Sequence, residues 1–183
     1  RIGEYYSDKI TNQKGSAGPY GPGTGAEQYS CRQNFAILTT DGYWDDSNIN
    51  GGSVGNQDNT NGSIITHADG HTTYQYTASR PFKDDWSDTL ADVAMKYWKR
   101  DLRTDLNNDV ATTTADPAFW QHMTTYALSL GVNGSLDPQT DLPALTSGAK
   151  SWPEPTSASG PGCPPGSARG RCLRAQPGPP TWW

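Results

Sequence analysis

The hydrophobic residues of this chain concentrate in three stretches, at about 34–44, 86–106 and 117–132, and polar sequence separates them. The first and third stretches have the length and composition of strands, whereas the second has the longer period of a helix. A strand, a crossover helix and a second strand form the pattern of a parallel βαβ unit. The pattern therefore predicts an α/β fold with a parallel sheet.

The first stretch predicts a buried strand that ends at a carboxylate. Phe35 to Leu38 form a continuous apolar run, and Thr39-Thr40 extend it until Asp41-Gly42 interrupts it. Ligands of open α/β sheets bind beyond the carboxyl ends of the strands, so Asp41 becomes the first candidate for function. The alternative interpretation is that Asp41-Gly42 only forms a turn.

The second stretch predicts a helix from about Asp85 to Leu102. Its apolar stripe comprises Trp86, Leu90, Val93, Ala94, Tyr97 and Trp98. Charges suit the helix dipole, with acids at the start and bases at the end: Asp84, Asp85 and Asp88, then Lys99, Arg100 and Arg103. Asp92 and Lys96 have the favourable i, i+4 order of an ion pair.

The third stretch begins at Asp116-Pro117, where we expect Asp116 to cap a short helical turn that runs through Trp120. Met123 to Val132 then predict the second buried strand. His122 lies just before this strand, where a packed or hydrogen-bonded histidine is the ordinary expectation.

We divide the chain into a Gly-rich irregular segment (1–30), an α/β region (31–145) with a long polar insertion (45–82), a Pro/Ser-rich linker (146–160) and a Pro/Gly/Arg-rich tail (161–183). Within the insertion we expect a small hairpin that carries Thr72 to Thr77. Tyr74 and Tyr76 alternate with polar neighbours there.

Charge is distributed unevenly along the chain. Residues 1–160 hold 11 Lys and Arg against 19 Asp and Glu, a net of −8, whereas residues 161–183 hold three Arg and no acid. An acidic body without a basic stripe argues against a nucleic-acid partner and favours cation binding. No segment has the apolar length of a transmembrane span.

Chemistry-bearing motifs are few. Asp46, Asn48, Asn50 and Gly51 match the start of an EF-hand calcium loop, but Gln57 occupies the twelfth position, where a bidentate Glu is expected. Calcium binding and a solvated turn remain alternatives there. Gly70 separates His67 from His71 and disfavours a two-histidine metal site. Cys31 has no evident His partner, and no nucleophile elbow or zinc-protease helix is present, so we predict no enzyme.

Four blocks of sequence resemble the type IV pilus tip adhesin and assembly family, PilC/PilY. They are Cys31 to Trp44, Ser87 to Arg103, Asp116 to Met123 and Leu130 to Val132. The resemblance covers roughly residues 29–160. Members of this family are several times longer, with an N-terminal part like a von Willebrand factor A-type domain and a C-terminal β-propeller. The resemblance implies that this chain is an internal piece of the first, a partial von Willebrand factor A-like (Rossmann-type) parallel sheet.

The resemblance also implies a role for the first motif. In A-type domains, the strand that ends Leu-Thr-Asp-Gly brings an Asp to a metal-ion-dependent adhesion site, and Asp41 occupies that position. Asp45 and Asp46 are its neighbouring candidate ligands. The Asp-x-Ser-x-Ser element of such a site would lie upstream of Arg1. Since Mg²⁺ or Ca²⁺ needs about six oxygen ligands, we do not expect this fragment to hold a divalent cation alone.

The tail departs from the family after Pro161, where acids vanish and Pro, Gly and Arg predominate. An out-of-frame translation of a GC-rich gene, a disordered Pro-rich tail and a Cys163–Cys172 disulfide loop are the alternatives. All three predict that residues from about 162 pack on nothing. With Cys31, the chain has three cysteines, so at least one is free or pairs with another chain.

The resemblance implies a bacterial cell-surface protein of the fimbrium, outer membrane or extracellular space. Its expected role is pilus assembly, surface adhesion and twitching motility, with minor pilins of the pilus tip and a host or abiotic surface as partners. The alternatives are a secreted carbohydrate- or surface-binding module and a non-functional truncated remnant. The binding module would use four aromatic residues that we expect to be exposed: Tyr43, Trp44, Tyr74 and Tyr76.

Overall fold

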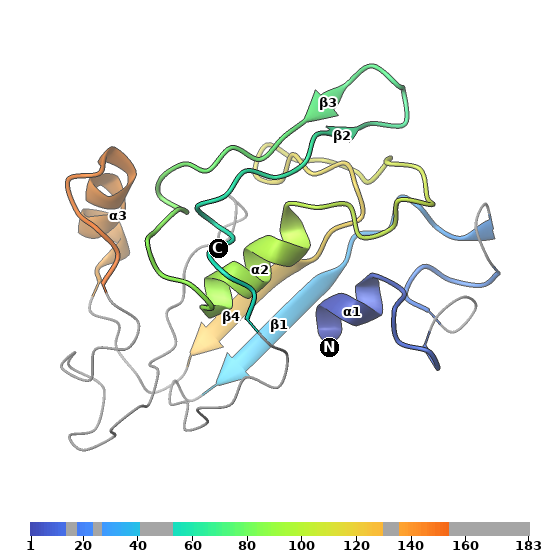
Figure 1. Ribbon diagram of the computed structural model, residues 1–183, viewed down its shortest axis with the longest axis horizontal. Helices are drawn as coiled ribbons and strands as arrows, with labels where there is room; N and C mark the ends of the chain where they lie inside the picture. Colours follow the sequence, from blue (N-terminus) through green and yellow to red (C-terminus); the bar gives the residue numbers. More distant parts are fainter. Residues whose placement is uncertain (14–17, 24–26, 41–52, 130–135, 154–183) are drawn as a thin grey trace.

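The fold is a mixed α/β arrangement with one small parallel sheet (Figure 1). A computed structural model describes residues 1–13, 18–23, 27–40, 53–129 and 136–153. Its elements, in chain order, are α1 (Ile2–Tyr6), β1 (Phe35–Thr40), β2 (Ile65–Thr66), β3 (Thr73–Tyr74), α2 (Leu90–Trp98), β4 (Thr124–Ser129) and α3 (Pro138–Ser147).

The parallel sheet consists of β1 and β4, paired in register from Phe35 opposite Thr124 to Thr40 opposite Ser129. The predicted first strand, the crossover helix and the parallel pairing are confirmed. The expected burial of the two strands is wrong, because Phe35, Ile37, Tyr126 and Leu128 are exposed on one face of the sheet. The predicted second strand is confirmed over Thr124–Ser129. Figure 1 shows α2 lying across the sheet. The buried residues of this interface are Ala36, Tyr97, Leu102 and Met123.

The crossover helix is shorter than the predicted span from Asp85 to Leu102. It begins at Leu90 because Thr89 is its N-cap, in a capping box where the Thr89 side chain accepts from the Asp92 N–H and the Asp92 carboxylate accepts from the Thr89 N–H. Asp88 has a φ of +62°, a left-handed conformation that a helix cannot contain. Asp92 therefore serves the cap, and its carboxylate is buried rather than lying on a solvated face.

The helices at the two ends were not predicted. Short α1 lies within the segment expected to be irregular, and the last turn of α3 enters the expected linker. The capping signals of α3 are present in the sequence, because Asp137 is its N-cap, Pro138 opens it and Gly148 ends it with a φ of +84°. The short helical turn predicted from Pro117 to Trp120 is wrong, since this described stretch forms no helix.

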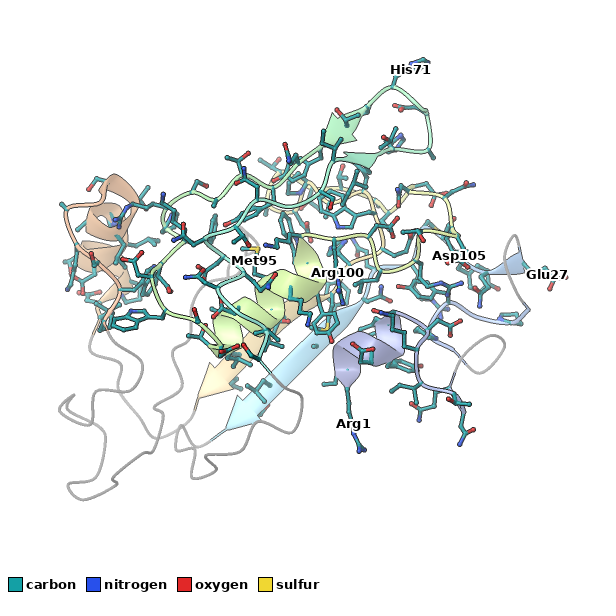
Figure 2. The ribbon with its side chains drawn as sticks, viewed as in Figure 1. Arg1, Glu27, His71, Met95, Arg100 and Asp105 are labelled. Atoms are coloured by element: carbon teal, nitrogen blue, oxygen red, sulfur yellow. The ribbon has the colours of Figure 1, made fainter. Side chains whose placement is uncertain are left out.

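The main core is an aromatic cluster between α2, the 117–120 segment and the β2–β3 hairpin. Its buried residues are Ile65, Tyr76, Met95, Trp98, Ala118, Phe119 and Trp120. The hairpin, expected around Thr72 to Thr77, is confirmed as β2 paired with β3, and Figure 2 shows His71 at its outer tip. Below we call these seven buried residues the aromatic core.

Of the aromatic residues expected to be exposed, Tyr76 belongs to the aromatic core and Tyr74 packs against it. Tyr76 is buried and donates its hydroxyl to the Asp58 carbonyl oxygen at 2.7 Å. Tyr74 is half-buried, with its ring 5.2 Å from that of Trp120. The expectation of an exposed aromatic surface is thus wrong for this pair, because the hairpin folds over Trp98 and Trp120. Tyr43 and Trp44 lie outside the described residues.

Candidate functional site

The predicted metal ligands Asp41, Asp45 and Asp46 lie outside the described residues, as does the calcium-loop half-motif up to Gly51. The described chain reaches this segment from one side at Thr40, the last residue of β1. Thr40 is in register with Ser129, so the carboxyl ends of β1 and β4 meet at one edge of the sheet. The sequence that carries the three carboxylates therefore leaves the sheet at the edge where ligands of α/β proteins bind.

The chain returns to the described part at Ser53, and Asp88 anchors it there. The Asp88 carboxylate accepts from the Ser53 hydroxyl at 2.8 Å, from the Val54 N–H at 2.5 Å and from the Gly55 N–H at 2.8 Å. These donors fix residues 53–55 just ahead of α2. The Asp88 carboxylate, which we expected to suit the helix dipole, instead holds a loop.

Gln57, the twelfth residue of the calcium-loop match, forms a second anchor of the same kind. Its N–H donates to the Asp92 carboxylate at 2.7 Å, and its side-chain amide donates to the Val54 carbonyl oxygen. Gln57 thus contributes to the packing of the loop against α2. Two carboxylates near the start of the helix, those of Asp88 and Asp92, accept hydrogen bonds from the backbone of this loop.

Lys99 places a buried positive charge beneath the same loop. Its Nζ donates to the Gln57 carbonyl oxygen at 2.6 Å, to the Thr60 carbonyl oxygen at 2.9 Å and to the Thr60 hydroxyl at 2.7 Å. Burial lowers the pKa of Lys99, and the nearby carboxylates of Asp58 and Asp92 oppose this shift. Its three ammonium protons match three oxygen acceptors, so the site holds a fixed cation of the chain itself.

Arg103, which follows α2 in the chain, is a second buried cation. The guanidinium donates twice to Asp105, at 2.8 Å and 2.7 Å, and once to Gln28 at 2.5 Å, and it lies over the ring of Tyr20. The hydrogen bonds from Arg103 lower the pKa of Asp105. Arg103 was expected to complement the helix dipole, but it is buried and ties the N-terminal segment to the body.

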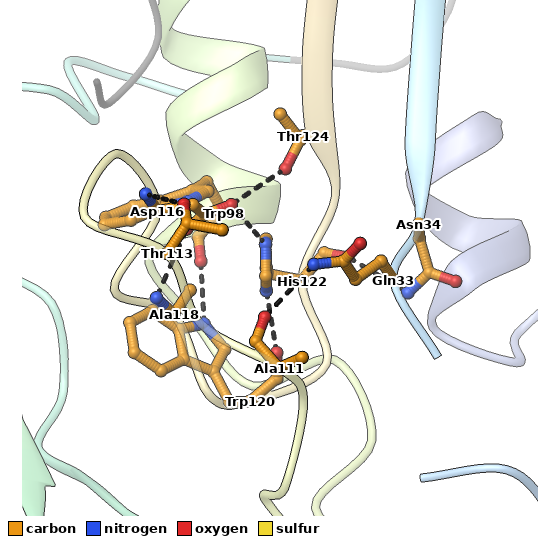
Figure 3. Close-up of polar contacts among 10 residues, drawn as sticks. All are labelled: Gln33, Asn34, Trp98, Ala111, Thr113, Asp116, Ala118, Trp120, His122 and Thr124. Atoms are coloured by element: carbon orange, nitrogen blue, oxygen red, sulfur yellow. Dashed lines mark hydrogen bonds and ion pairs between the residues drawn. The ribbon is translucent and has the colours of Figure 1, made fainter. Parts of the chain in front are cut away.

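The group that most resembles a catalytic pair is Asp116 with His122 (Figure 3). His122 Nε2 lies 3.0 Å from the Asp116 carboxylate, which also accepts from the Trp98 indole, the Ala118 N–H and the Thr124 hydroxyl. Burial raises the pKa of Asp116, but the hydrogen bond and positive charge of His122 outweigh burial, so the pKa lies below its usual range.

The geometry of this pair is structural. The other ring nitrogen of His122, Nδ1, lies 2.7 Å from the Trp120 carbonyl oxygen, so both nitrogens face oxygen atoms of the chain itself. His122 is also buried. Both ring nitrogens are thus engaged within the fold. The expectation of a hydrogen-bonded histidine is confirmed, and Asp116, expected to cap a turn, is the centre of a network that sequence reasoning missed.

The described ranges hold neither a candidate metal cluster nor a candidate membrane-spanning helix. There, no group of three or more His, Cys, Asp or Glu side chains could hold a metal ion. None of the helices described is long and apolar enough to cross a membrane. Cys31 is exposed and forms no disulfide with another described cysteine, while Cys163 and Cys172 lie beyond the described part.

The described contacts thus define an α/β region in which the buried charges serve the fold. Comparison with known proteins supplies the family. The chain is 39% identical over 155 residues to the type IV pilus biogenesis factor PilY1 of Pseudomonas aeruginosa strain PAK, and 38% identical over 155 residues to that of strain PAO1. It is 30% identical over 159 residues to that of strain UCBPP-PA14. The chain belongs to the PilY1 family.

The similarity covers 73% to 74% of this chain but only 12% to 13% of the length of each relative. The chain therefore corresponds to a small part of a PilY1 protein. No model of a known protein family matches the chain. No solved structure matches it significantly.

Proposed function

We propose that this chain is part of a type IV pilus-associated protein of the bacterial surface, fimbrium, outer membrane or extracellular space. The observation that carries the proposal is the 39% identity to a type IV pilus biogenesis factor. In this proposal the region supports pilus assembly, surface adhesion and twitching motility by binding and not by catalysis. Its partners are minor pilins of the pilus tip and a host or abiotic surface.

We further propose a von Willebrand factor A-like fold for the intact region. The parallel order β1-α2-β4, with the helix on one face of the sheet, supports this assignment. In such a fold Asp41 would be a ligand of a divalent cation, Mg²⁺ or Ca²⁺, with Asp45 and Asp46 nearby. These carboxylates are too few for a hard cation that needs about six oxygen ligands, so further ligands must come from elsewhere in the protein.

A chimeric PilY1 in living cells tests the proposed role in pilus assembly. The aligned stretch of P. aeruginosa PilY1 is replaced by this sequence, and twitching zones and surface pili are compared with those of cells that carry unaltered PilY1. We expect the chimera to restore both. A stable, exported chimera that restores neither would contradict the role in assembly.

The metal proposal has its own variant pair in the same chimera. Asp41→Asn should weaken Mg²⁺ or Ca²⁺ binding in calorimetric titration and reduce surface adhesion. The control is Asp85→Asn, which removes a charge from an exposed carboxylate just ahead of α2. Equal cation binding by the two variants, at equal stability, would contradict a ligand role for Asp41.

A further inference from the structure

The two edges of the β2–β3 hairpin differ in what they contact. On the outer edge of β2, the Asn108 side chain donates to the Thr66 carbonyl oxygen at 2.9 Å, and the Ala68 N–H donates to the Asn108 carbonyl oxygen at 3.0 Å. The segment around Asn108 therefore closes that edge. β3 forms the other edge, and Figure 1 shows it at the outer margin of the molecule.

The pairing register shows which backbone groups of the hairpin face outward. Residues opposite each other in an antiparallel pair bond either to each other or both outward. Thr66 bonds outward to Asn108, so the backbone of its partner Thr73 also faces outward. Tyr76 bonds inward, because its carbonyl oxygen accepts from the Gly62 N–H at 2.9 Å, and its two neighbours therefore face outward. The outward-facing residues are Thr73, Gln75 and Thr77, all of them exposed. Below we call their backbone the free edge.

The free edge lacks the features that ordinarily prevent an edge strand from pairing. Natural edge strands are protected by charged side chains, by Pro or by a covering loop. Residues 72–79, Thr-Thr-Tyr-Gln-Tyr-Thr-Ala-Ser, contain no charged residue, no Pro and no Gly. No described residue accepts a hydrogen bond from the three N–H groups of the free edge. A row of unpaired backbone groups on an uncharged strand is a template for a further strand.

The sequence of the free edge indicates which strand would fit it. Residues 73–77 read Thr-Tyr-Gln-Tyr-Thr and are symmetric about Gln75. Two such strands, placed antiparallel about a two-fold axis at Gln75, bring Thr opposite Thr, Tyr opposite Tyr and Gln opposite Gln. Cross-strand Thr pairs are favourable, and no like charges meet. The symmetry therefore favours a second copy of the same strand over an unrelated peptide.

We propose that the free edge pairs with the free edge of a second copy of this chain, so that the two hairpins form one four-stranded antiparallel sheet in the order β2-β3-β3-β2. Each pair of outward-facing residues exchanges two N–H···O=C bonds, about six in all. Such an edge contact is smaller than the about 1,200 Å² of a stable interface, so the dimer is reversible and depends on concentration. The inference is independent of pilus assembly, adhesion and metal binding.

Disulfide cross-linking tests the register of this pair. The variants are made in this chain with its three native cysteines replaced by serine. Gln75→Cys places the two new thiols directly opposite each other, with Cα atoms about 5.5 Å apart, which suits a disulfide. Thr73→Cys is the matched control on the same edge, because two copies of residue 73 would lie about 14 Å apart. A mixture of Thr73→Cys and Thr77→Cys chains restores a facing pair.

Under mild oxidation we expect Gln75→Cys to form dimers about tenfold faster than Thr73→Cys alone, and the mixture to match Gln75→Cys. Equal rates for Gln75→Cys and Thr73→Cys would overturn the proposal, because random collisions have no register. A chain that stays monomeric and forms no cross-link would also overturn it, in favour of a different occupant of the edge.

A backbone variant tests the hydrogen bonds themselves. Gln75→Pro removes the N–H donors of the central pair, which the hairpin itself does not use. Gln75→Ala is its control, because it loses the same side-chain bond to the Gly62 carbonyl oxygen but keeps the backbone N–H. In sedimentation equilibrium, Gln75→Pro should weaken dimerisation about tenfold relative to Gln75→Ala. Equal dimerisation of the two variants would overturn the proposal, since another surface would then join the copies.

Discussion

The aromatic core and the open face of the β1–β4 sheet differ in how far the chain buries their side chains. The open face consists of Phe35, Ile37, Tyr126 and Leu128. Trp120 and Trp98 are 0% and 2% exposed, whereas Ile37 and Leu128 are 71% and 52% exposed. The core is made largely by long connecting segments folded over one helix, and the sheet contributes little to it. In this chain, regular secondary structure is therefore a poor guide to where the stability resides.

The buried polar contacts also gather around α2 and its loops and not on the open face of the sheet. The buried Lys99 and Arg103 and the partly buried Asp116 all lie around α2 and its loops, each with several hydrogen-bond partners. These contacts let polar, Gly-rich segments pack as closely as regular elements do, because a buried polar group is tolerated only when it is paired. The comparison predicts large effects for substitutions around the core and small ones on the open face.

The largest effect should come from Trp120→Ala. The side chain is fully buried and its indole N–H donates to the Trp98 carbonyl oxygen at 2.8 Å. We expect a loss of about 3 to 5 kcal/mol in the free energy of unfolding, measured by urea denaturation. The matched substitution on the open face, Ile37→Ala, should change it by only about 0.5 kcal/mol. Similar losses for both variants would contradict the division into two regions.

A smaller loss is expected for Lys99→Met, which keeps the length of the side chain but removes its charge. The carbonyl oxygens of Gln57 and Thr60 would lose their donor inside the protein, at a cost of about 1 to 3 kcal/mol. Lys96→Met on the same helix is the control and should be close to neutral. If the two variants unfold at the same urea concentration, the Lys99 contacts do not hold the loop.

The smallest effect should come from Asp116→Asn, and it should depend on pH. The pKa of Asp116 is lowered in the folded state, so its contribution to stability is present above the unfolded pKa of about 3.9 and is lost as the pH falls through the folded pKa. The variant should lose about 1 to 2 kcal/mol at pH 7, and this difference should shrink between about pH 5 and pH 2.

Chemical unfolding of both proteins across this pH range measures the effect. Asp85→Asn, at an exposed position, serves as the control for charge removal alone. A difference between wild type and Asp116→Asn that stays constant with pH would show that the carboxylate charge is not what His122 stabilises.

The sequence predicted the strands well and the helix ends poorly. Phe35–Thr40 was found because a short apolar run bounded by Asp-Gly has few alternatives. The start of α2 was placed five residues early because apolar Trp86 continues the helical spacing. Thr89 and Asp92 form a capping box that the apolar periodicity obscured, and the left-handed backbone of Asp88 leaves no periodic signal.

Tertiary packing determines which aromatic side chains are buried, and the pattern of apolar and polar residues does not predict it. Tyr74 and Tyr76 alternate with polar residues, as exposed aromatics do, but the hairpin folds onto Trp98 and Trp120 and buries them wholly or in part. The partners of Asp116 lie 2 to 18 residues away in sequence, on α2, on β4 and in the stretch between them, where the apolar pattern does not indicate which side chains meet. Of the proposed metal site, the strand leading to Asp41 was predicted and confirmed, while Asp41 itself stays a prediction.

The hydrogen bonds between the segment before β1 and the segment before β4 have a consequence for folding kinetics. The Asn34 side chain donates to the His122 carbonyl oxygen across a sequence separation of 88 residues, and Gln121 donates to the Ser30 carbonyl oxygen across 91. Parallel pairing must wait for a loop of this length to close, and proteins dominated by such contacts fold in about milliseconds to seconds. Until then both apolar strands are exposed, so a newly made chain passes through a period in which aggregation competes with folding.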